Sequence, residues 1–187
     1  MKAIMISIQP QWVEKILNGE KTIEIRKTIP KCELPVKVYI YCTMPNKQEN
    51  RKPHSWEVVW LKRVVAEFTL KNIVKFDIES LIFMGKEKEL MQKSCIGGLS
   101  LRKYLGDKTG YSWGIDNLKV YETPKELSEF SHYIPNNKCP KKECGIDCED
   151  CMSYDVEHET CLDLYYLYRQ IKRPPQSWCY VEEIENE

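Results

Sequence analysis

The sequence predicts a mixed α+β domain: a β-barrel with short flanking helices and a Cys-rich insert. Strand-like segments alternate with short amphipathic helices, and their order does not follow a regular βαβ repeat. At 187 residues, with 42% hydrophobic and 30% charged side chains, the chain has the size and composition of one globular domain. We therefore expect a single domain over residues 1–187, with its core at about 1–134, a Cys-rich insert at 136–161 and a closing strand at 177–183.

The first part of the chain is expected to form strands around one helix. Pro10 suits the first turn of a helix, and Asn18-Gly19 is a typical end for it. Residues 36–43 alternate apolar side chains with Tyr39 and Tyr41, which predicts a strand with an aromatic outer face. The strands expected here are 2–8, 22–27 and 36–43, followed by strand-rich sequence over 57–76.

The second part is expected to contain helices before the final strands. An amphipathic pattern predicts a helix over 78–91, and a shorter helix is expected to begin at Ser100 and stop at Gly106. Residues 111–121 resemble a further strand. Thr123, Pro124 and Glu126 then have the spacing of a capping box, which predicts that a helix begins there.

The segment Gly19–Lys27 carries the most distinctive polar pattern. Because side chains alternate faces along a strand, Glu24 and Arg26 project together while Ile23 and Ile25 point the other way. Lys21 precedes these two residues, and the three are here called the Lys/Glu/Arg row. Two interpretations of the row stay open: a solvated face of an antiparallel sheet, or one wall of a binding cleft.

Charge is unevenly distributed, although the formal net charge is zero. Residues 1–75 contain 14 Lys and Arg against 7 Asp and Glu, whereas the remainder contains 14 against 21. The half with the Lys/Glu/Arg row is basic and is where an anionic ligand would be drawn. No long apolar run or signal peptide is visible, so we expect a cytoplasmic protein without a membrane segment.

The nine cysteines then favour free thiols and metal over a disulfide framework. Four of them fall within thirteen residues, an arrangement that predicts one structural zinc site with tetrahedral coordination. The expected ligands are Cys139, Cys144, Cys148 and Cys151. An iron–sulfur cluster and unligated thiols are the alternatives that the spacing leaves open. The scattered cysteines elsewhere are expected to be small buried hydrophobic residues.

The chain resembles the ASCH domain family, which belongs to the PUA-like superfamily of small β-barrels. The resemblance lies mainly in Gly19-Glu20-Lys21-Thr22-Ile23-Glu24-Ile25-Arg26-Lys27, with support from Ala3–Pro10. Later segments that match are Tyr39–Thr43 and Tyr111–Ile115 through Tyr121–Pro124. The likeness covers about residues 1–134.

This resemblance implies a cleft on a PUA-like barrel that binds RNA or a single nucleobase. The residue types present suit such a ligand, because cations hold phosphates, aromatic rings stack bases and polar side chains read base edges. For phosphates the candidates are Lys21, Arg26 and Lys27. For stacking they are Tyr41, Trp113 and Trp178, and for polar contacts Glu24, Thr43 and Ser112.

Two other functions stay open beside binding. Some ASCH proteins are amidohydrolases with a Lys and a Thr nucleophile on this strand. Here Lys21 matches the Lys, but Glu24 occupies the Thr position. A carboxylate cannot replace a hydroxyl nucleophile without changing the chemistry. Other relatives are ribonucleases, in which case Lys21 and Glu24 would act as acid/base and charge stabiliser. The third possibility is a module that recruits a protein through the Cys-rich insert.

Overall fold

We describe the fold from a computed structural model of the chain. It describes residues 1–45, 54–55, 57–133, 154–155, 160–161 and 170–184. The four cysteines expected to bind zinc lie outside these residues. The short pair β8 (Tyr154–Asp155) and β9 (Thr160–Cys161) belongs to the same region of the sequence.

A five-stranded sheet forms the larger layer, in the order β10-β1-β3-β4-β7. β1 runs parallel to β3, and the other neighbours are antiparallel. A strand is present where the closing strand was predicted, and this β10 pairs with β1 from Lys2 opposite Glu182 to Ile6 opposite Trp178. The bounds are β1 Lys2–Ile8, β3 Val36–Cys42, β4 Arg63–Leu70, β7 Asp116–Glu126 and β10 Trp178–Glu182.

A second sheet of three strands contains the Lys/Glu/Arg row. Its order is β2-β6-β5, with β2 at Ile23–Arg26, β6 at Gly110–Gly114 and β5 at Ile73–Phe76. The strand expected over 111–121 is therefore two strands in different sheets. The chain changes sheet at Ile115, whose backbone N–H donates to the Thr22 carbonyl at 3.0 Å. The α+β class is confirmed, although in the described part of the chain the two sheets do not join into a closed barrel.

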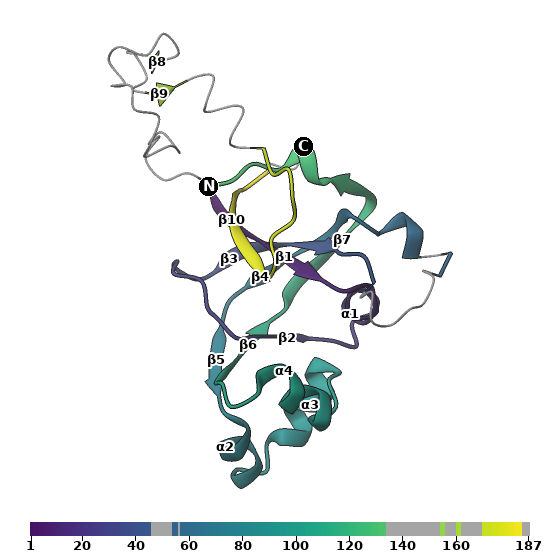
Figure 1. Ribbon diagram of the computed structural model, residues 1–187, viewed down its shortest axis with the longest axis vertical. Coiled ribbons are helices and arrows are strands. Elements are labelled where there is room, and N and C mark those ends of the chain that lie inside the picture. The colour runs from purple at the N-terminus through teal and green to yellow at the C-terminus, as the bar shows by residue number, and fades with distance from the viewer. Residues whose placement is uncertain (46–53, 56, 134–153, 156–159, 162–169, 185–187) are drawn as a thin grey trace.

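In the described part of the chain four α-helices flank these sheets, and α2, α3 and α4 gather beyond the smaller one (Figure 1). They are α1 (Pro10–Leu17), α2 (Ile78–Phe83), α3 (Glu87–Ser94) and α4 (Gly98–Leu105). The single helix predicted over 78–91 is wrong, because Gly85 adopts a positive φ of 66° and breaks it into α2 and α3. The predicted stop at Gly106 is confirmed.

The helix predicted at Thr123 is also wrong. β7 continues through Glu126 because its backbone pairs with β4, and an ion pair of 2.8 Å joins Arg63 to Glu126. A capping box does form, but three residues later, between Glu126 and Glu129 around a 3-10 turn at Leu127–Glu129. Long-range strand pairing thus overrides a local helix signal.

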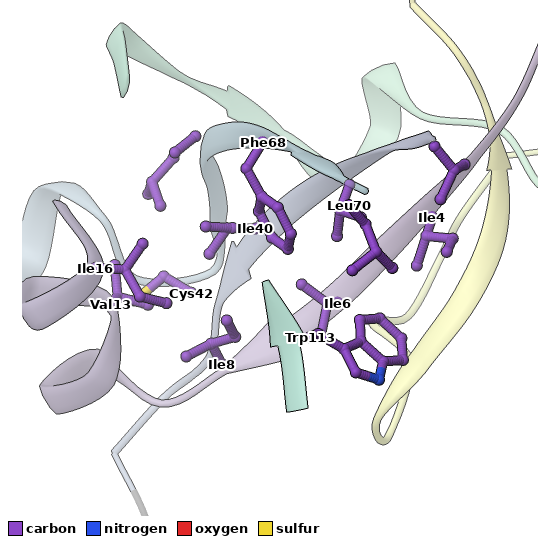
Figure 2. Close-up of a cluster of buried hydrophobic side chains, with 14 residues drawn as sticks. Ile4, Ile6, Ile8, Val13, Ile16, Ile40, Cys42, Phe68, Leu70 and Trp113 are labelled. Carbon is purple, nitrogen blue, oxygen red and sulfur yellow. The ribbon is translucent and has the colours of Figure 1, made fainter. Parts of the chain in front are cut away.

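The main core lies between the five-stranded sheet, α1 and β6. Figure 2 shows Ile4, Ile6 and Ile8 of β1 beside Ile40 and Cys42 of the neighbouring strand β3 in this core. Further members include Val13 and Ile16 from α1, and Trp113 from β6. This packing fixes the ends of β1 and β3 beside β2, where the polar row lies.

The other face of the large sheet is covered as well. Tyr39 and Tyr41 are 1% and 5% exposed, so the predicted aromatic outer face of β3 is buried. Phe130 and Ile171 pack against it, with the Tyr39 and Phe130 rings 5.0 Å apart. Sequence alternation identified the two faces of β3 but could not reveal that a later segment covers the second one. Among the described helices, none is long and apolar enough to cross a membrane.

Candidate functional site

The polar row begins where α1 ends. Gly19 has a positive φ of 75°, which turns the chain sharply after the helix. The Lys21 N–H then donates to the Lys15 carbonyl, and the Thr22 N–H donates to the Lys93 carbonyl of α3, both at 2.9 Å. β2 follows and pairs with β6, with Glu24 opposite Trp113. The row is therefore held between α1, α3 and β6.

The three charged side chains form one buried ion cluster. Glu24 lies between two cations: its Oε2 is 3.2 Å from Lys21 Nζ, and its Oε1 is 3.5 Å from Arg26 Nη2. Lys21 is 1% exposed, Glu24 7% and Arg26 9%. Burial of three charges requires mutual pairing, because each ion loses its hydration. The cluster carries one excess positive charge.

Each of the two cations donates a hydrogen bond to one backbone carbonyl. Lys21 Nζ donates to the Ser94 carbonyl at 2.7 Å, and Arg26 Nη2 donates to the Ser7 carbonyl at 2.8 Å. Two buried polar atoms of the cluster have no hydrogen-bond partner among the described residues: Arg26 Nε, and Glu24 Oε2, whose one close contact is the ion pair with Lys21. Buried polar groups without a partner are uncommon in folded proteins, and each requires an explanation such as a bound water, an ion or a functional role.

A pocket of about 530 Å³ opens over this cluster. That volume lies in the range usual for small-ligand sites. Its walls come from the end of β1, α1, β2, the end of β3, the α3–α4 region and the segment before β10. The lining residues are Ser7, Gln9, Trp12, Lys21, Glu24, Ile25, Arg26, Thr43, Ile96, Ser100, Tyr104, Pro174, Pro175 and Gln176.

Two aromatic side chains belong to this lining. Lys21 Nζ lies 5.5 Å from the centre of the Trp12 ring, and Lys27 Nζ lies 4.8 Å from the centre of the Tyr104 ring. Burial raises the pKa of Tyr104, while the neighbouring Arg26 acts to lower it. The pocket thus combines cations, one carboxylate and flat apolar surfaces.

The structure brings four of the predicted site residues together. Lys21, Glu24, Arg26 and Thr43 all line the pocket. Lys27 is exposed and reaches the pocket's edge through its contact with the Tyr104 ring. The cleft reading of the Gly19–Lys27 segment therefore fits the geometry, whereas a solvated sheet face does not, because the charged side chains are buried.

The other four predicted residues lie away from the pocket lining. Tyr41 faces the second core cluster, and Trp113 is fully buried in the main core. Ser112 Oγ on β6 donates to the Val74 carbonyl on β5 at 3.4 Å. Trp178 contacts Trp113 with ring centres 6.0 Å apart and donates from Nε1 to Thr28 Oγ1 at 2.9 Å.

Sequence reasoning missed several lining residues. Trp12 and Tyr104 sit on helices and resembled ordinary apolar-face residues. Ser7 lies near the end of the buried strand β1, and Gln9 follows that strand. Residues 174–176 precede β10 and carry no motif that suggests a ligand contact. The one available signal was Pro174-Pro175 directly before the predicted closing strand, since a strand that pairs with β1 brings its preceding segment to Ser7.

Metal ligands do not gather in the described part of the chain, where no group of three or more His, Cys, Asp or Glu side chains has metal-binding geometry. Cys32, Cys42, Cys95 and Cys179 are free thiols there. Burial raises the pKa of Cys42 to about 12 and that of Cys179 to about 11, so both behave as inert thiols. The zinc prediction falls on residues outside this part and stays a prediction.

Comparison with known proteins agrees with the resemblance to ASCH domains seen in the sequence. No family model matches the chain. A protein from Zymomonas mobilis named ASCH domain-containing ribonuclease is 39% identical over 80 residues, which cover 43% of this chain and 44% of that protein. The match thus spans less than half the length of this curated relative.

Solved structures share the fold over most of the chain. A crystal structure of the ASCH protein from Z. mobilis has a TM-score of 0.52 at 19% identity, covering 97% of this chain and 88% of that one. A point mutant of the same protein gives 0.57 at 18% identity, covering 97% and 89%. The chain therefore shares its fold with the Z. mobilis ASCH protein. The local sequence match and the shared fold both agree with the resemblance to ASCH-domain proteins.

Proposed function

We propose that this protein binds single-stranded RNA, or a nucleotide, in the pocket over Lys21, Glu24 and Arg26. The observation that carries the proposal is a buried ion cluster with unsatisfied polar atoms at the base of a pocket that also has aromatic walls. An unpaired nucleotide needs these features together: polar groups for its base edge, a flat surface for stacking and positive potential for its phosphate. The curated relative's name supports RNA as the ligand class.

The depth of the pocket favours an unpaired nucleotide over a duplex. Glu24 and Arg26 are at least nine-tenths buried, so only a group that leaves base stacking can reach them. Trp12 and Tyr104 are the rings available for stacking there, in place of Tyr41, Trp113 and Trp178. Thr43 remains as an additional polar contact in the lining.

RNA cleavage is the second candidate, and the name of the curated relative favours it. In such a reaction Glu24 would take the proton of a ribose 2′-hydroxyl, whose oxygen would bond to the adjacent phosphorus. The bond from phosphorus to the 5′-oxygen would break, and that oxygen would receive a proton from Lys21. The products would be a 2′,3′-cyclic phosphate and a 5′-hydroxyl. Arg26 would stabilise the charge on the phosphorus oxygens.

Binding is the primary proposal because the pocket offers few groups for proton transfer. Glu24 is the one carboxylate among its described lining residues, and that lining contains no histidine. The amidohydrolase function keeps the difficulty stated above, since Glu24 occupies the position of the Thr nucleophile and Thr43 lies just after β3 rather than on β2.

The test is fluorescence anisotropy of a labelled single-stranded RNA of about a dozen nucleotides, followed by a denaturing gel of the same samples. We expect salt-dependent binding that weakens for Lys21→Met, which removes the charge of the cluster while keeping its length. Shortened RNA that appears with wild type but not with folded Glu24→Gln would establish cleavage. If wild type binds neither the RNA nor free nucleotides at low salt, the proposal is wrong.

A further inference from the structure

The segment Lys172–Ser177, here called the strap, crosses one side of the pocket. It is held at both ends: the Ile171 N–H donates to the Phe130 carbonyl at 3.0 Å, and Trp178 begins β10. Its middle residues, Pro174 to Gln176, line the pocket. β10, yellow in Figure 1, lies beside β1 and carries the strap to the end of that strand.

Ser7 fixes the strap to the ion cluster through three hydrogen bonds. Its Oγ donates to the Pro175 carbonyl at 2.7 Å, and its N–H donates to the Ser177 carbonyl at 2.9 Å. Its own carbonyl accepts from Arg26 Nη2 at 2.8 Å. One residue therefore sets the strap's position relative to the guanidinium. Two adjacent prolines stiffen the strap further.

The ion cluster itself is poorly suited to backbone phosphates. Lys21 is 1% exposed, and its ammonium already contacts Ser94 and Glu24. Glu24 offsets the charge of one of the two cations and would repel an anion that came close. A nucleic acid that uses this pocket needs exposed positive charge at the rim for its phosphates.

The strap supplies that charge. Lys172 and Arg173 are exposed and directly precede Pro174, which lines the pocket. Because consecutive Cα atoms are about 3.8 Å apart, the Cα atoms of both residues lie within about 8 Å of that of Pro174. No described residue forms an ion pair with either. We propose that the strap is a second RNA-contact element, in which Lys172 and Arg173 bind the phosphates beside the nucleotide in the pocket. Ser7 is its positioning residue.

This inference rests on the proposed RNA function, and one experiment separates the two. Anisotropy of the labelled single-stranded RNA is measured across a salt series for wild type, Lys172→Ala/Arg173→Ala and the charge-matched control Lys75→Ala/Lys119→Ala. The control cations are exposed on β5 and β7 and do not line the pocket. For single strands each phosphate contact contributes about 0.7 to the slope of log K against log salt.

We expect the strap variant to lower that slope by about 1.4 and to weaken binding about tenfold at low salt, while the control matches wild type. Binding of a free nucleoside, which has no phosphate, should be equal in all three proteins. Equal slopes for the strap variant and the control would overturn the inference and leave the proposed function intact. Absence of binding by wild type would overturn both.

Discussion

Glu24 determines the character of the pocket at the scale of single residues. Its carboxylate lies between Lys21 and Arg26 and balances one of two buried positive charges. Removal of one partner from a buried ion cluster leaves charge without compensation, which costs more than the pair contributes in net terms. Glu24 is therefore important to folding as well as to any ligand.

Glu24→Gln should lower the free energy of unfolding by about 3–5 kcal/mol, because Lys21 and Arg26 would then be buried cations without a counterion. Urea denaturation followed by circular dichroism measures this. The control is Glu89→Gln on α3, whose pair with Lys93 is largely exposed and screened by water. We expect no measurable change there. Equal effects of the two substitutions would show that the cluster is not buried as described.

Buried thiols give a dependence on alkaline pH. Burial raises the pKa of Cys42 from its ordinary 9.0 to about 12, so the folded state retains a proton that the unfolded state loses above about pH 9. The stability due to this proton is complete below pH 9 and falls as pH rises toward 12. Between about pH 8 and 10.5, reduced wild type should lose on the order of 1–2 kcal/mol more than Cys42→Ala.

Urea midpoints at a series of pH values, with reductant present, test this difference. Cys95→Ala serves as the control, because Cys95 is only partly buried at the end of α3 and is not part of the core clusters. Its pH profile should follow that of wild type. A Cys42→Ala profile that also follows wild type would mean that the thiol is accessible in the folded state.

Ser7 matters at the scale of elements, since it joins β1, β2 and the strap. Ser7→Ala removes the hydrogen bond to the Pro175 carbonyl, so we expect a loss of about 1 kcal/mol in stability and weaker RNA binding as the strap shifts. Ser112→Ala is the matched control: both serines are 8% exposed, but Ser112 Oγ makes a longer contact of 3.4 Å on β6.

Anisotropy and urea denaturation of the two variants check this prediction. RNA affinity should fall for Ser7→Ala and stay at the wild-type value for Ser112→Ala. A shift of the strap should also change the salt slope, which a general loss of stability would not. If both variants bind RNA like wild type, Ser7 does not position the strap.

Local sequence patterns predicted the elements that depend on local chemistry. Pro10 and Gly19 bound α1 as expected, and alternation along residues 23–26 placed Glu24 and Arg26 on one face. Patterns failed where distant strands decided the outcome. β4 keeps residues 123–126 in β7, and the change of sheet at Ile115 separates two strands that read as one.

Sequence patterns likewise predicted the part of the site that lies in one segment and missed the part that tertiary packing assembles. The polar side chains on the strand were found because they share one short segment and one face. Trp12, Tyr104 and the strap were missed because tertiary packing alone brings α1, α4 and β10 to that strand. For the same reason, Tyr41 and Trp113 resembled ligand contacts but lie in the two core clusters.

At the scale of the whole molecule, we propose that the Cys-rich insert at 136–161 holds a structural zinc ion. Protein purified under reducing conditions should contain about one zinc per chain, because four thiolates complete a tetrahedral site. Cys144→Ser/Cys148→Ser should lose the metal, and Cys32→Ser should retain it. Elemental analysis distinguishes the outcomes. Iron in place of zinc would favour an iron–sulfur cluster, and protein that contains neither metal would indicate free thiols.

Zinc removal also tests whether the Cys-rich insert contributes to RNA binding. Zinc removal by a chelator should leave RNA binding in the pocket intact, because residues 21–26, α1 and α4 supply the ion cluster and the aromatic walls. Loss of RNA affinity together with the metal would show that the insert contributes to the RNA site.

The most direct test of the central claim fills the pocket without changing its charge. Ser100 is exposed and lines the pocket, whereas the neighbouring Leu99 is 87% exposed and does not. RNA anisotropy is compared for wild type, Ser100→Trp and Leu99→Trp. If the pocket is the RNA site, Ser100→Trp should weaken binding at least tenfold while Leu99→Trp binds like wild type. Unchanged binding by a folded Ser100→Trp protein would contradict the assignment of RNA to this pocket.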